Sequence, residues 1–505
     1  MNFIPETPGS TPNYWCTWTS QNWTVEERRQ AAPLFNGDQG AYTARDSIYE
    51  ERFFGSNGWA EFYEPVRSDL YTVLDDGWDV PFGVHPDKNL ASFGAVEPDR
   101  ERFHSCRGSA AERLAMLNTL FRQRGWRGAG LWIAAHAAGE DNSRRFSEEE
   151  LRQYWQTRLE WCAASGINYW KVDWGVHSHD LEFRRMQTGL GRRFAPALNI
   201  EHCIPMGPLN GLSFTDCAAE GSGRFADGGQ IPALLRELLS FSAITRVYDT
   251  VVPLAQATTL DRTAFCLACR PVGLLNLEDE VYMAAALGCT FGAMRAPDWT
   301  NLSCDRVVNC RKRGIEVVRA ANWQRLAPAF PGTEPAISNT VLYDEWFYEP
   351  ETIWDGRCWG KTIRQGAPAA VARNTALPTA SGPELPYLAA SRHPGGAYAI
   401  AVLPRTGTAQ GFHGTDCDVF ADPGDWVENI GLFGNFRNFA IRTGVRPKQI
   451  WLQDLAVRDN AQDVTERIHF QDGVLSLSGS LVRECSLQNT PSEAQPGLLL
   501  HLSIV

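Results

Sequence analysis

Acidic side chains follow apolar segments directly at two places in the chain, where they could take part in nucleophilic or acid–base chemistry. Asp75 and Asp76 end the apolar run of LYTVLDDGWD, and Asp173 ends that of NYWKVDWG, two residues after Lys171. Residues two apart on a strand point to the same side, so Lys171 and Asp173 share a face. If that face lines a barrel, the ammonium lies beside the carboxylate and keeps it ionised, as a nucleophile requires. A buried ion pair that only closes the end of the barrel is the alternative.

A further acid follows a later apolar segment, ITRVYDTV, in which Asp249 lies three residues after Arg246. Retaining glycosidases use two carboxyl groups about 5–5.5 Å apart, one as nucleophile and one as acid/base. We count the segments that end near Asp173 and Asp249 as the fourth and sixth strands, whose ends could face each other across the mouth of a barrel. Taken alone, Asp249 is typical of a turn at the end of a strand.

One segment illustrates how the chain would position these acids. Ser147 and Glu150 form a capping-box pattern at the start of a helix. Apolar residues then recur at helical spacing, and Gly166 suits the position that ends the helix. The segment 169–172 follows as a short buried strand, which ends at Asp173.

Neighbouring segments repeat this alternation of strand and helix from about residue 12 to residue 320. Helices are expected around 114–121 and 234–239, and strands at 129–135 and 244–248. Parallel strands that are each followed by a helix predict a (β/α)₈ barrel, in which the chemistry lies at the C-terminal ends of the strands.

Helical spacing fades after about residue 325, and strand-like segments separated by turn residues take its place. The clearest of these segments are 397–404, 449–455, 473–481 and 497–505. The fold class we predict is therefore α/β, with a (β/α)₈ barrel over 1–322 and an antiparallel, β-sandwich-like domain over 323–505. The stretch 328–378 reads as irregular.

Composition restricts the classes of partner. The 505 residues carry a formal net charge of −12, which argues against nucleic acid or an anionic membrane as the main partner. No run of eighteen apolar residues could cross a bilayer. The first residues show no basic start followed by an apolar stretch, so a cytoplasmic location is expected.

The cysteines give no sign of a metal or redox site, whereas the tryptophans favour a carbohydrate ligand. The 13 cysteines are scattered, as expected for reduced and buried small side chains, and the pair Cys266 and Cys269 has no second pair at zinc spacing. The 18 tryptophans are many for this length, and several stand beside Gly, Asp or Asn. Flat apolar faces flanked by polar groups suit a sugar, so we expect a small carbohydrate ligand.

The acidic motifs, taken in order, resemble the α-galactosidase and α-N-acetylgalactosaminidase (melibiase) clan of retaining glycosidases. The strongest matches are LDDGW, where the clan's Asp pair binds sugar hydroxyls, and KVDWG, where the clan carries its nucleophile. The resemblance therefore assigns sugar binding to Asp75, Asp76 and Lys171, and makes Asp173 the nucleophile.

Weaker matches fall between and after these motifs. Trp18 matches the clan's tryptophan at the end of the first strand, and Trp132, in Gly-Leu-Trp, matches its third strand. Arg246 matches the arginine of the sixth strand. Asn276 and Asp279 of NLEDE resemble the clan's seventh-strand N-D-P-D stretch. The similarity spans roughly residues 12 to 300.

The chain departs from the clan at two positions. The clan places its acid/base four residues after the arginine, whereas Asp249 is three residues after Arg246 and position 250 is Thr. Besides Asp249, the candidates for the acid/base are Glu201, Asp216 and Glu220. On the fifth strand Cys203 stands where the reader of the sugar's 2-substituent belongs, as in a bacterial branch of the clan.

The resemblance implies a double displacement at an α-linked, galactose-like glycoside. Asp173 would attack the anomeric carbon and Asp249 would act as acid and then as base. No metal or organic cofactor is required by this chemistry. The sequence leaves the oligomeric state open, a homo-oligomer included.

The sequence leaves two other functions open besides a retaining glycosidase. A metal-dependent sugar isomerase or epimerase on the same barrel could use His104, His136, Glu201 and His202 as ligands. A carbohydrate-binding protein that has lost catalysis would account for the irregular spacing around Asp249.

Overall fold

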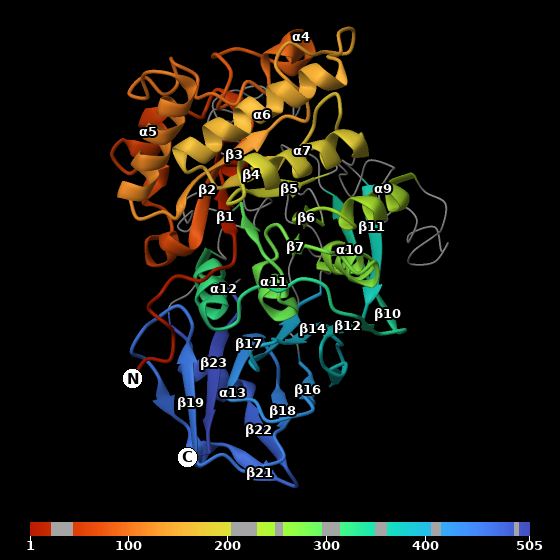
Figure 1. Cartoon of the computed structure of the whole chain (residues 1–505). Helices are drawn as coiled ribbons and strands as arrows, with labels where there is room; N and C mark the ends of the chain where they lie inside the picture. The colour runs from red at the N-terminus through yellow and green to blue at the C-terminus, as the bar shows by residue number, and fades with distance from the viewer. Residues whose placement is uncertain are drawn as a thin grey trace.

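Eight parallel strands form a closed barrel in the N-terminal part of the chain (Figure 1). The computed structural model describes residues 1–21, 44–203, 230–247, 256–294, 314–348, 361–405, 416–488 and 494–504. The barrel strands are β1 (Asn13–Cys16), β2 (Leu70–Leu74), β3 (Gly128–Ile133), β4 (Tyr169–Val172), β5 (Asn199–His202), β6 (Ile244–Arg246), β7 (Leu274–Asn276) and β8 (Gly292–Ala293). They pair in the order β7-β6-β5-β4-β3-β2-β1-β8, and Thr290 closes the ring by exchanging backbone hydrogen bonds with Leu275 and Leu277. The predicted (β/α)₈ barrel is confirmed.

A helix follows each strand from β2 onward and covers the outside of the barrel (Figure 1). These helices are α5 (Ala110–Gln123), α6 (Glu148–Ser165), α7 (Leu181–Phe194), α9 (Gln230–Leu239), α10 (Gln256–Ala268), α11 (Val281–Leu287) and α12 (Gly314–Leu326). Short helical pieces lie between β1 and α5, namely α3 (Glu50–Phe54), η1 (Trp59–Glu61), η2 (Glu64–Asp69), α4 (Pro86–Asn89) and η3 (Leu90–Ser92).

The α6–β4 unit forms as its sequence predicts. The Ser147 hydroxyl accepts the backbone N–H of Glu150, and the Glu150 carboxylate accepts the backbone N–H of Ser147 in return. Gly166 ends α6 with φ of +69°, a left-handed conformation that favours glycine. Because α6 begins and ends at fixed points, β4 and the acid after it are held in one register.

Removal of this cap should destabilise the first turn of α6. We expect Ser147→Ala to lower the free energy of unfolding by about 1 kcal/mol, since it leaves an N-terminal N–H of the helix without a partner. Thr157→Ala on the same helix is the matched control, because its exposed hydroxyl only bonds back to the carbonyl of Gln153 and alanine favours helix. Urea unfolding of both variants measures the difference, and an equal loss in the two would contradict the capping role.

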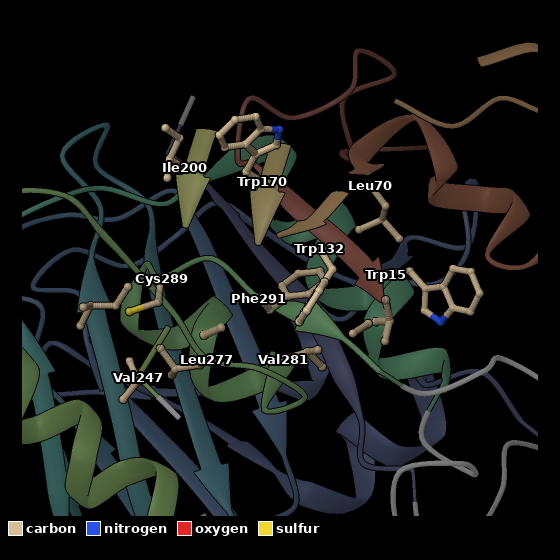
Figure 2. Packing of buried hydrophobic residues seen from close by; sticks show 14 of the residues in the cluster. Trp15, Leu70, Trp132, Trp170, Ile200, Val247, Leu277, Val281, Cys289 and Phe291 are labelled. Atoms are coloured by element: carbon tan, nitrogen blue, oxygen red, sulfur yellow. The ribbon is translucent and has the colours of Figure 1, made fainter. Parts of the chain in front are cut away.

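Side chains alternate between the two faces of each barrel strand. Trp15 and Trp170 point away from the barrel interior (Figure 2). Trp15 packs on Trp126, and Trp170 packs on Trp155 of α6. Their neighbours in sequence point into the barrel, among them Tyr14, which fills space left open by a glycine on β8. A Cβ at Gly292 would lie 2.2 Å from the Tyr14 ring, so that position requires glycine.

The C-terminal part consists mainly of strands, as predicted. An eight-stranded sheet has the order β20-β19-β23-β17-β15-β14-β12-β9, and a five-stranded sheet has the order β13-β16-β18-β22-β21. Its strands are β9 (Pro335–Ile337), β12 (Ala370–Arg373), β13 (Thr379–Ser381), β14 (Tyr387–Arg392), β15 (Tyr398–Leu403), β16 (Asp418–Ala421), β17 (Asn429–Gly434), β18 (Asn438–Arg442), β19 (Gln449–Asp454), β20 (Gln462–Asp463), β21 (His469–Gln471), β22 (Val474–Ser478) and β23 (Gly497–Ser503). Most pairs are antiparallel, but β12–β14, β15–β17 and β16–β18 are parallel.

Two details of this part differ from the sequence reading. The stretch 328–378, which reads as irregular, contains β9, β12 and the hairpin of β10 (Val341–Tyr348) and β11 (Lys361–Pro368). The end of the segment 473–481 begins a helix, α13 (Gly479–Cys485), because Ser478 caps it by accepting the N–H of Leu481.

The predicted boundary at 322/323 falls inside α12, and the division of the chain there stays a prediction. Helix α12 contacts both parts: Arg319 donates to both carboxylate oxygens of Asp454 at the end of β19, at 2.9 and 2.6 Å. Both side chains are buried. Within the described residues, no helix is long and apolar enough to span a membrane.

Candidate active site

Asp173 follows β4 directly and lies buried at the C-terminal end of the barrel. Its oxygen Oδ2 accepts the indole N–H of Trp132 at 3.2 Å and lies 3.3 Å from Nη2 of Arg246. Arg184 of α7 donates to the backbone carbonyl of Asp173 at 2.9 Å, which fixes the main chain. The other oxygen, Oδ1, is buried and has no hydrogen-bond partner among the described residues. One oxygen of this carboxylate is thus held by Trp132 and Arg246, and the other is not engaged by any described residue.

Lys171 points into the barrel, as its spacing predicts, but it does not pair with Asp173. Its ammonium lies 2.7 Å from Oδ2 of Asp75 and 3.5 Å from Oε1 of Glu278. The cation next to Asp173 is Arg246 of β6 instead. The expected Lys171–Asp173 contact is therefore wrong, because the lysine side chain instead reaches the acids that follow β2 and β7.

The two acids after β2 have different surroundings. Both oxygens of Asp75 are engaged: Oδ1 accepts the backbone N–H of Asp76, and Oδ2 accepts Lys171 and the thiol of Cys16. Burial raises the pKa of the Asp75 carboxyl, but Lys171 and the hydrogen bonds outweigh it and hold that pKa below its ordinary value. Asp76 has Oδ2 bound to Arg45 and Trp174, while its buried Oδ1 has no hydrogen-bond partner in the described part of the chain.

Aromatic rings surround the Asp76–Arg45 pair. The Arg45 guanidinium lies 5.9 Å from the ring centroids of Trp18, Phe93 and Trp174. Trp18 and Trp174 are both half-buried. Burial raises the pKa of Asp76 even though Arg45 opposes it. Trp18, predicted from the first strand, is therefore close to Asp76.

Beneath Asp173, a polar network fills the barrel interior. Arg246 donates from Nη1 to Oε1 of Glu278 at 3.1 Å, and its Nε lies 3.7 Å from Oε1 of Glu201. The Tyr14 hydroxyl lies 3.1 Å from Oε1 of Glu278 and 3.3 Å from Oε1 of Glu201. Tyr169 donates to Oε2 of Glu201 at 2.7 Å. The network joins side chains of β1, β4, β5, β6 and the segment after β7.

This network holds more acid than base. Among the residues that the structure describes, the cations that contact Asp75, Glu201 and Glu278 here are Lys171 and Arg246, and all five side chains are buried. Burial raises the pKa of both glutamates, against the opposing effect of Arg246. A phenol has one proton, so Tyr14 can donate to only one glutamate, and its contact with the other is satisfied when that carboxyl is protonated. The interior therefore favours a proton on the Glu201–Tyr14–Glu278 group.

Three further predicted residues lie at the C-terminal ends of β5 and β7 or soon after them. Cys203 is buried directly after β5, with its backbone N–H bound to the carbonyl of Val172. Asp279 has φ of +62° and accepts the backbone N–H of Met294 after β8, so it ties two strand ends together. Asn276 donates to Oε2 of Glu201.

Three acid/base candidates, Asp249, Asp216 and Glu220, lie outside the described residues. Glu201, the fourth candidate, is fully buried, and both its oxygens are engaged by barrel side chains. Because both of its oxygens are held inside the barrel, the structure does not support Glu201 as the acid/base.

The predicted metal ligands do not converge. His104 is exposed and lies 2.6 Å from Glu51, whereas His202 packs between the barrel and α7, with Nε2 2.8 Å from the hydroxyl of Thr188. Among the residues that the structure describes, no three His, Cys, Asp or Glu side chains are grouped as a metal site needs. The geometry therefore does not support the ligand set of an isomerase or epimerase.

The sequence analysis did not identify several side chains of the site, among them Cys16, Arg45 and Glu278. Strand periodicity would have found two of them, because Cys16 shares a face with Tyr14, and Glu278 shares one with Asn276. Arg45 gives no such signal, since it lies in the connection between β1 and β2.

Comparisons with known proteins give similarity of fold. No family model matches the chain, and no curated protein matches it in sequence. Among solved structures, it is similar to a GH27 β-L-arabinopyranosidase from Geobacillus stearothermophilus, at 10% identity and a TM-score of 0.36, over 98% of this chain and 96% of the other. It is also similar to α-galactosidase I from Mortierella vinacea and to the α-galactosidase from Saccharomyces cerevisiae with raffinose. Both are 10% identical over 98% of either chain, with TM-scores of 0.36 and 0.37. Such values assign no residue and no activity, so the function is derived below from the site itself.

Proposed function

We propose that this chain is a retaining glycoside hydrolase that cleaves α-linked, galactose-like glycosides, with Asp173 as nucleophile. The observation that carries the proposal is the asymmetry of the Asp173 carboxylate. Oδ2 is fixed by Trp132 and Arg246, whereas Oδ1 has no hydrogen-bond partner among the described residues. A covalent nucleophile needs this arrangement, with one oxygen oriented and the other able to reach the substrate. Its place at the C-terminal end of a barrel strand is where such enzymes carry their chemistry.

The proposed reaction is a double displacement. Oδ1 of Asp173 forms a bond to the anomeric carbon as the bond to the leaving oxygen breaks, and an acid donates a proton to that oxygen. Water then attacks the glycosyl ester, gives up a proton to the same residue, and frees Asp173. Asp249 is our proposed acid/base from its place after Arg246 in the sequence. Retention of configuration follows from the two inversions at the same carbon.

Asp76 is proposed to bind a sugar hydroxyl through Oδ1. We expect Asp76→Ala to lose about 1.5–3 kcal/mol of substrate or transition-state stabilisation, the usual value of a hydrogen bond to a charged group. Steady-state kinetics should show this as a loss of about tenfold to a hundredfold in kcat/KM. Asp418→Ala, an exposed acid of the C-terminal part that pairs with Arg437, is the control. Equal kinetics for wild type and Asp76→Ala would show that Asp76 only anchors Arg45.

A panel of aryl α- and β-glycosides tests the function. Galactosides and L-arabinopyranosides belong in it together, because α-D-galactopyranose and β-L-arabinopyranose differ only by a hydroxymethyl group. Hydrolysis of an α-galactoside or β-L-arabinopyranoside, with retained configuration in the first product seen by NMR, is expected. Sugar binding with no turnover of any activated glycoside would favour a binding protein instead. Turnover that a chelator abolishes and a divalent ion restores would favour metal chemistry.

A further inference from the structure

Arg45 holds Asp76 by a single carboxylate oxygen. Its Nε and Nη2 both donate to Oδ2, at 2.9 and 2.6 Å, and the indole N–H of Trp174 donates to the same atom at 3.2 Å. The buried pair of Arg319 and Asp454 differs, because there the guanidinium donates to both carboxylate oxygens. Within the described residues, the side chains that bind the Asp76 carboxylate thus converge on Oδ2, and Oδ1 is left buried without a hydrogen-bond partner.

An ion pair that served stability alone would engage this oxygen as well, because a buried polar atom without a partner costs free energy. The same pattern recurs at Asp173, where Arg246 and Trp132 hold Oδ2 and no described residue engages Oδ1. The two indoles that hold these carboxylates lie against each other, with 5.0 Å between the ring centroids of Trp132 and Trp174. The hold on Asp76 therefore resembles the hold on the proposed nucleophile and differs from that of a structural pair.

Aromatic rings fix the guanidinium of Arg45. It lies 5.9 Å from the ring centroids of Trp18, Phe93 and Trp174, a distance at which a cation is attracted to a ring. The side chains of Arg45 and Asp76 are both nearly fully buried. Arg45 comes from the connection between β1 and β2, outside the motifs that carry the resemblance. Its charge therefore acts on Asp76 from a fixed place.

Charged groups around Asp76 oppose one another. Burial raises the pKa of Asp76, Arg45 opposes this effect, and the neighbouring Asp75 raises that pKa further. Asp79 is the other acid that interacts with Asp76, and burial raises the pKa of Asp79 to about 7. In the part of the chain that the structure describes, Arg45 is the cation placed against Asp76. Without Arg45, the Asp76 carboxyl should take up a proton at a higher pH.

We infer that Arg45 is a positioning residue for sugar binding, which turns Oδ1 of Asp76 toward the substrate and keeps this carboxylate a charged acceptor. The inference rests on the proposed function, in which Asp76 binds a hydroxyl of the sugar that Asp173 attacks. An ionised carboxylate accepts hydrogen bonds and donates none, so the group that it binds must be a donor. The substrate class is then a glycoside whose sugar has a free hydroxyl at this position, and not one with an ether or a carboxylate there.

Two variants weaken the hold on Oδ2 to different degrees. Arg45→Met removes the cation, whereas Trp174→Phe removes one neutral donor and keeps an aromatic ring. For an aryl α-glycoside that wild type cleaves, we expect Arg45→Met to lower kcat/KM at pH 5 by about tenfold to a hundredfold. The acidic limb of its pH profile should move up by about one pH unit or more. Trp174→Phe should give a smaller shift in the same direction, and Arg45→Lys, which keeps the charge, should keep the acidic limb of wild type.

Arg319→Met is the matched control, since it removes a buried arginine that pairs with Asp454 outside the site. It should lower the midpoint of thermal unfolding and leave the pH profile unchanged. Asp76→Asn removes the group that titrates. In the double variant, Arg45→Met should therefore shift the profile of Asp76→Asn no further.

The outcomes separate this inference from the proposed function. An equal loss at every pH in folded Arg45→Met, with no shift of the acidic limb, would mean that Arg45 only supports the structure. If Arg45→Met does not fold, an unshifted limb in Trp174→Phe overturns the inference instead. If wild type cleaves no glycoside, the proposed function fails, and calorimetric titration with D-galactose and L-arabinose measures the same pH shift in binding. Binding of neither sugar by wild type overturns both.

Discussion

Asp173→Ala is expected to lower kcat for an aryl α-glycoside by about four powers of ten, because removal of a nucleophile leaves only binding and charge stabilisation. The same change should barely affect the fold. Asp173 lies at a strand end, its backbone is held by Arg184, and its cation Arg246 keeps Glu278 as a partner. Steady-state assays measure kcat, and urea unfolding measures the free energy of unfolding separately.

A small external nucleophile distinguishes loss of the nucleophile from general damage. Azide can enter the space that the truncated side chain leaves and attack the anomeric carbon directly. With one displacement in place of two, the product is the glycosyl azide of inverted configuration, which NMR identifies. Asp173→Asn keeps the shape of the side chain and should be nearly inactive as well. If Asp173→Ala retained more than about a tenth of wild-type kcat, its assignment as nucleophile would be wrong.

Local patterns predicted the elements that carry the site. The capping box at Ser147, the glycine at 166 and the apolar run before Asp173 each specify backbone geometry through neighbouring residues alone. The same holds for Asp75 and Asp76, which follow β2 directly. These acids lie on the same face of the barrel, because the parallel strands of a barrel all end on one face.

Contacts across the barrel axis could not be predicted in this way. Lys171 shares a strand face with Asp173, but its side chain is long enough to reach acids that follow other strands, and it contacts Asp75 and Glu278. Which acid Lys171 contacts depends on the distance between strands that are far apart in sequence. It also depends on which acids already pair with another cation. Strand periodicity indicates the side to which Glu278 points, but its partners Lys171 and Arg246 could not be predicted in this way, because they lie on β4 and β6. The alternation of residues along a strand predicts the face to which a side chain points, but it does not predict which residue on another strand that side chain contacts.

The second large effect concerns the stability of this interior network. Lys171→Met is expected to lower the free energy of unfolding by about 3–5 kcal/mol, because it leaves the buried Asp75 and Glu278 carboxyls without their ammonium. Burial and Arg246 lower the pKa of Lys171, but Asp75, Cys16 and Glu278 outweigh them and raise it well above its ordinary value. Its contribution is therefore complete below the unfolded pKa of about 10.4 and is lost only as pH rises through the folded pKa. Urea unfolding between pH 5 and pH 8 should show the full loss throughout.

Glu278→Gln is the matched variant, and its expected result is the opposite. Glutamine can keep the oxygen that accepts from Lys171, Arg246 and Tyr14, and it removes one of the acids that the two cations must balance. Burial raises the pKa of Glu278, so the folded protein binds a proton more tightly than the unfolded chain, and wild-type stability falls as pH rises above the unfolded pKa of about 4.3. Glu278→Gln should therefore cost no more than about 1 kcal/mol near pH 5, since glutamine, like the protonated carboxyl, is neutral and keeps an oxygen that accepts hydrogen bonds. Its stability should also decline less than that of wild type toward pH 8. A loss as large as that of Lys171→Met would mean that Glu278 is ionised in the folded protein and that charge pairing, not a shared proton, stabilises the barrel interior.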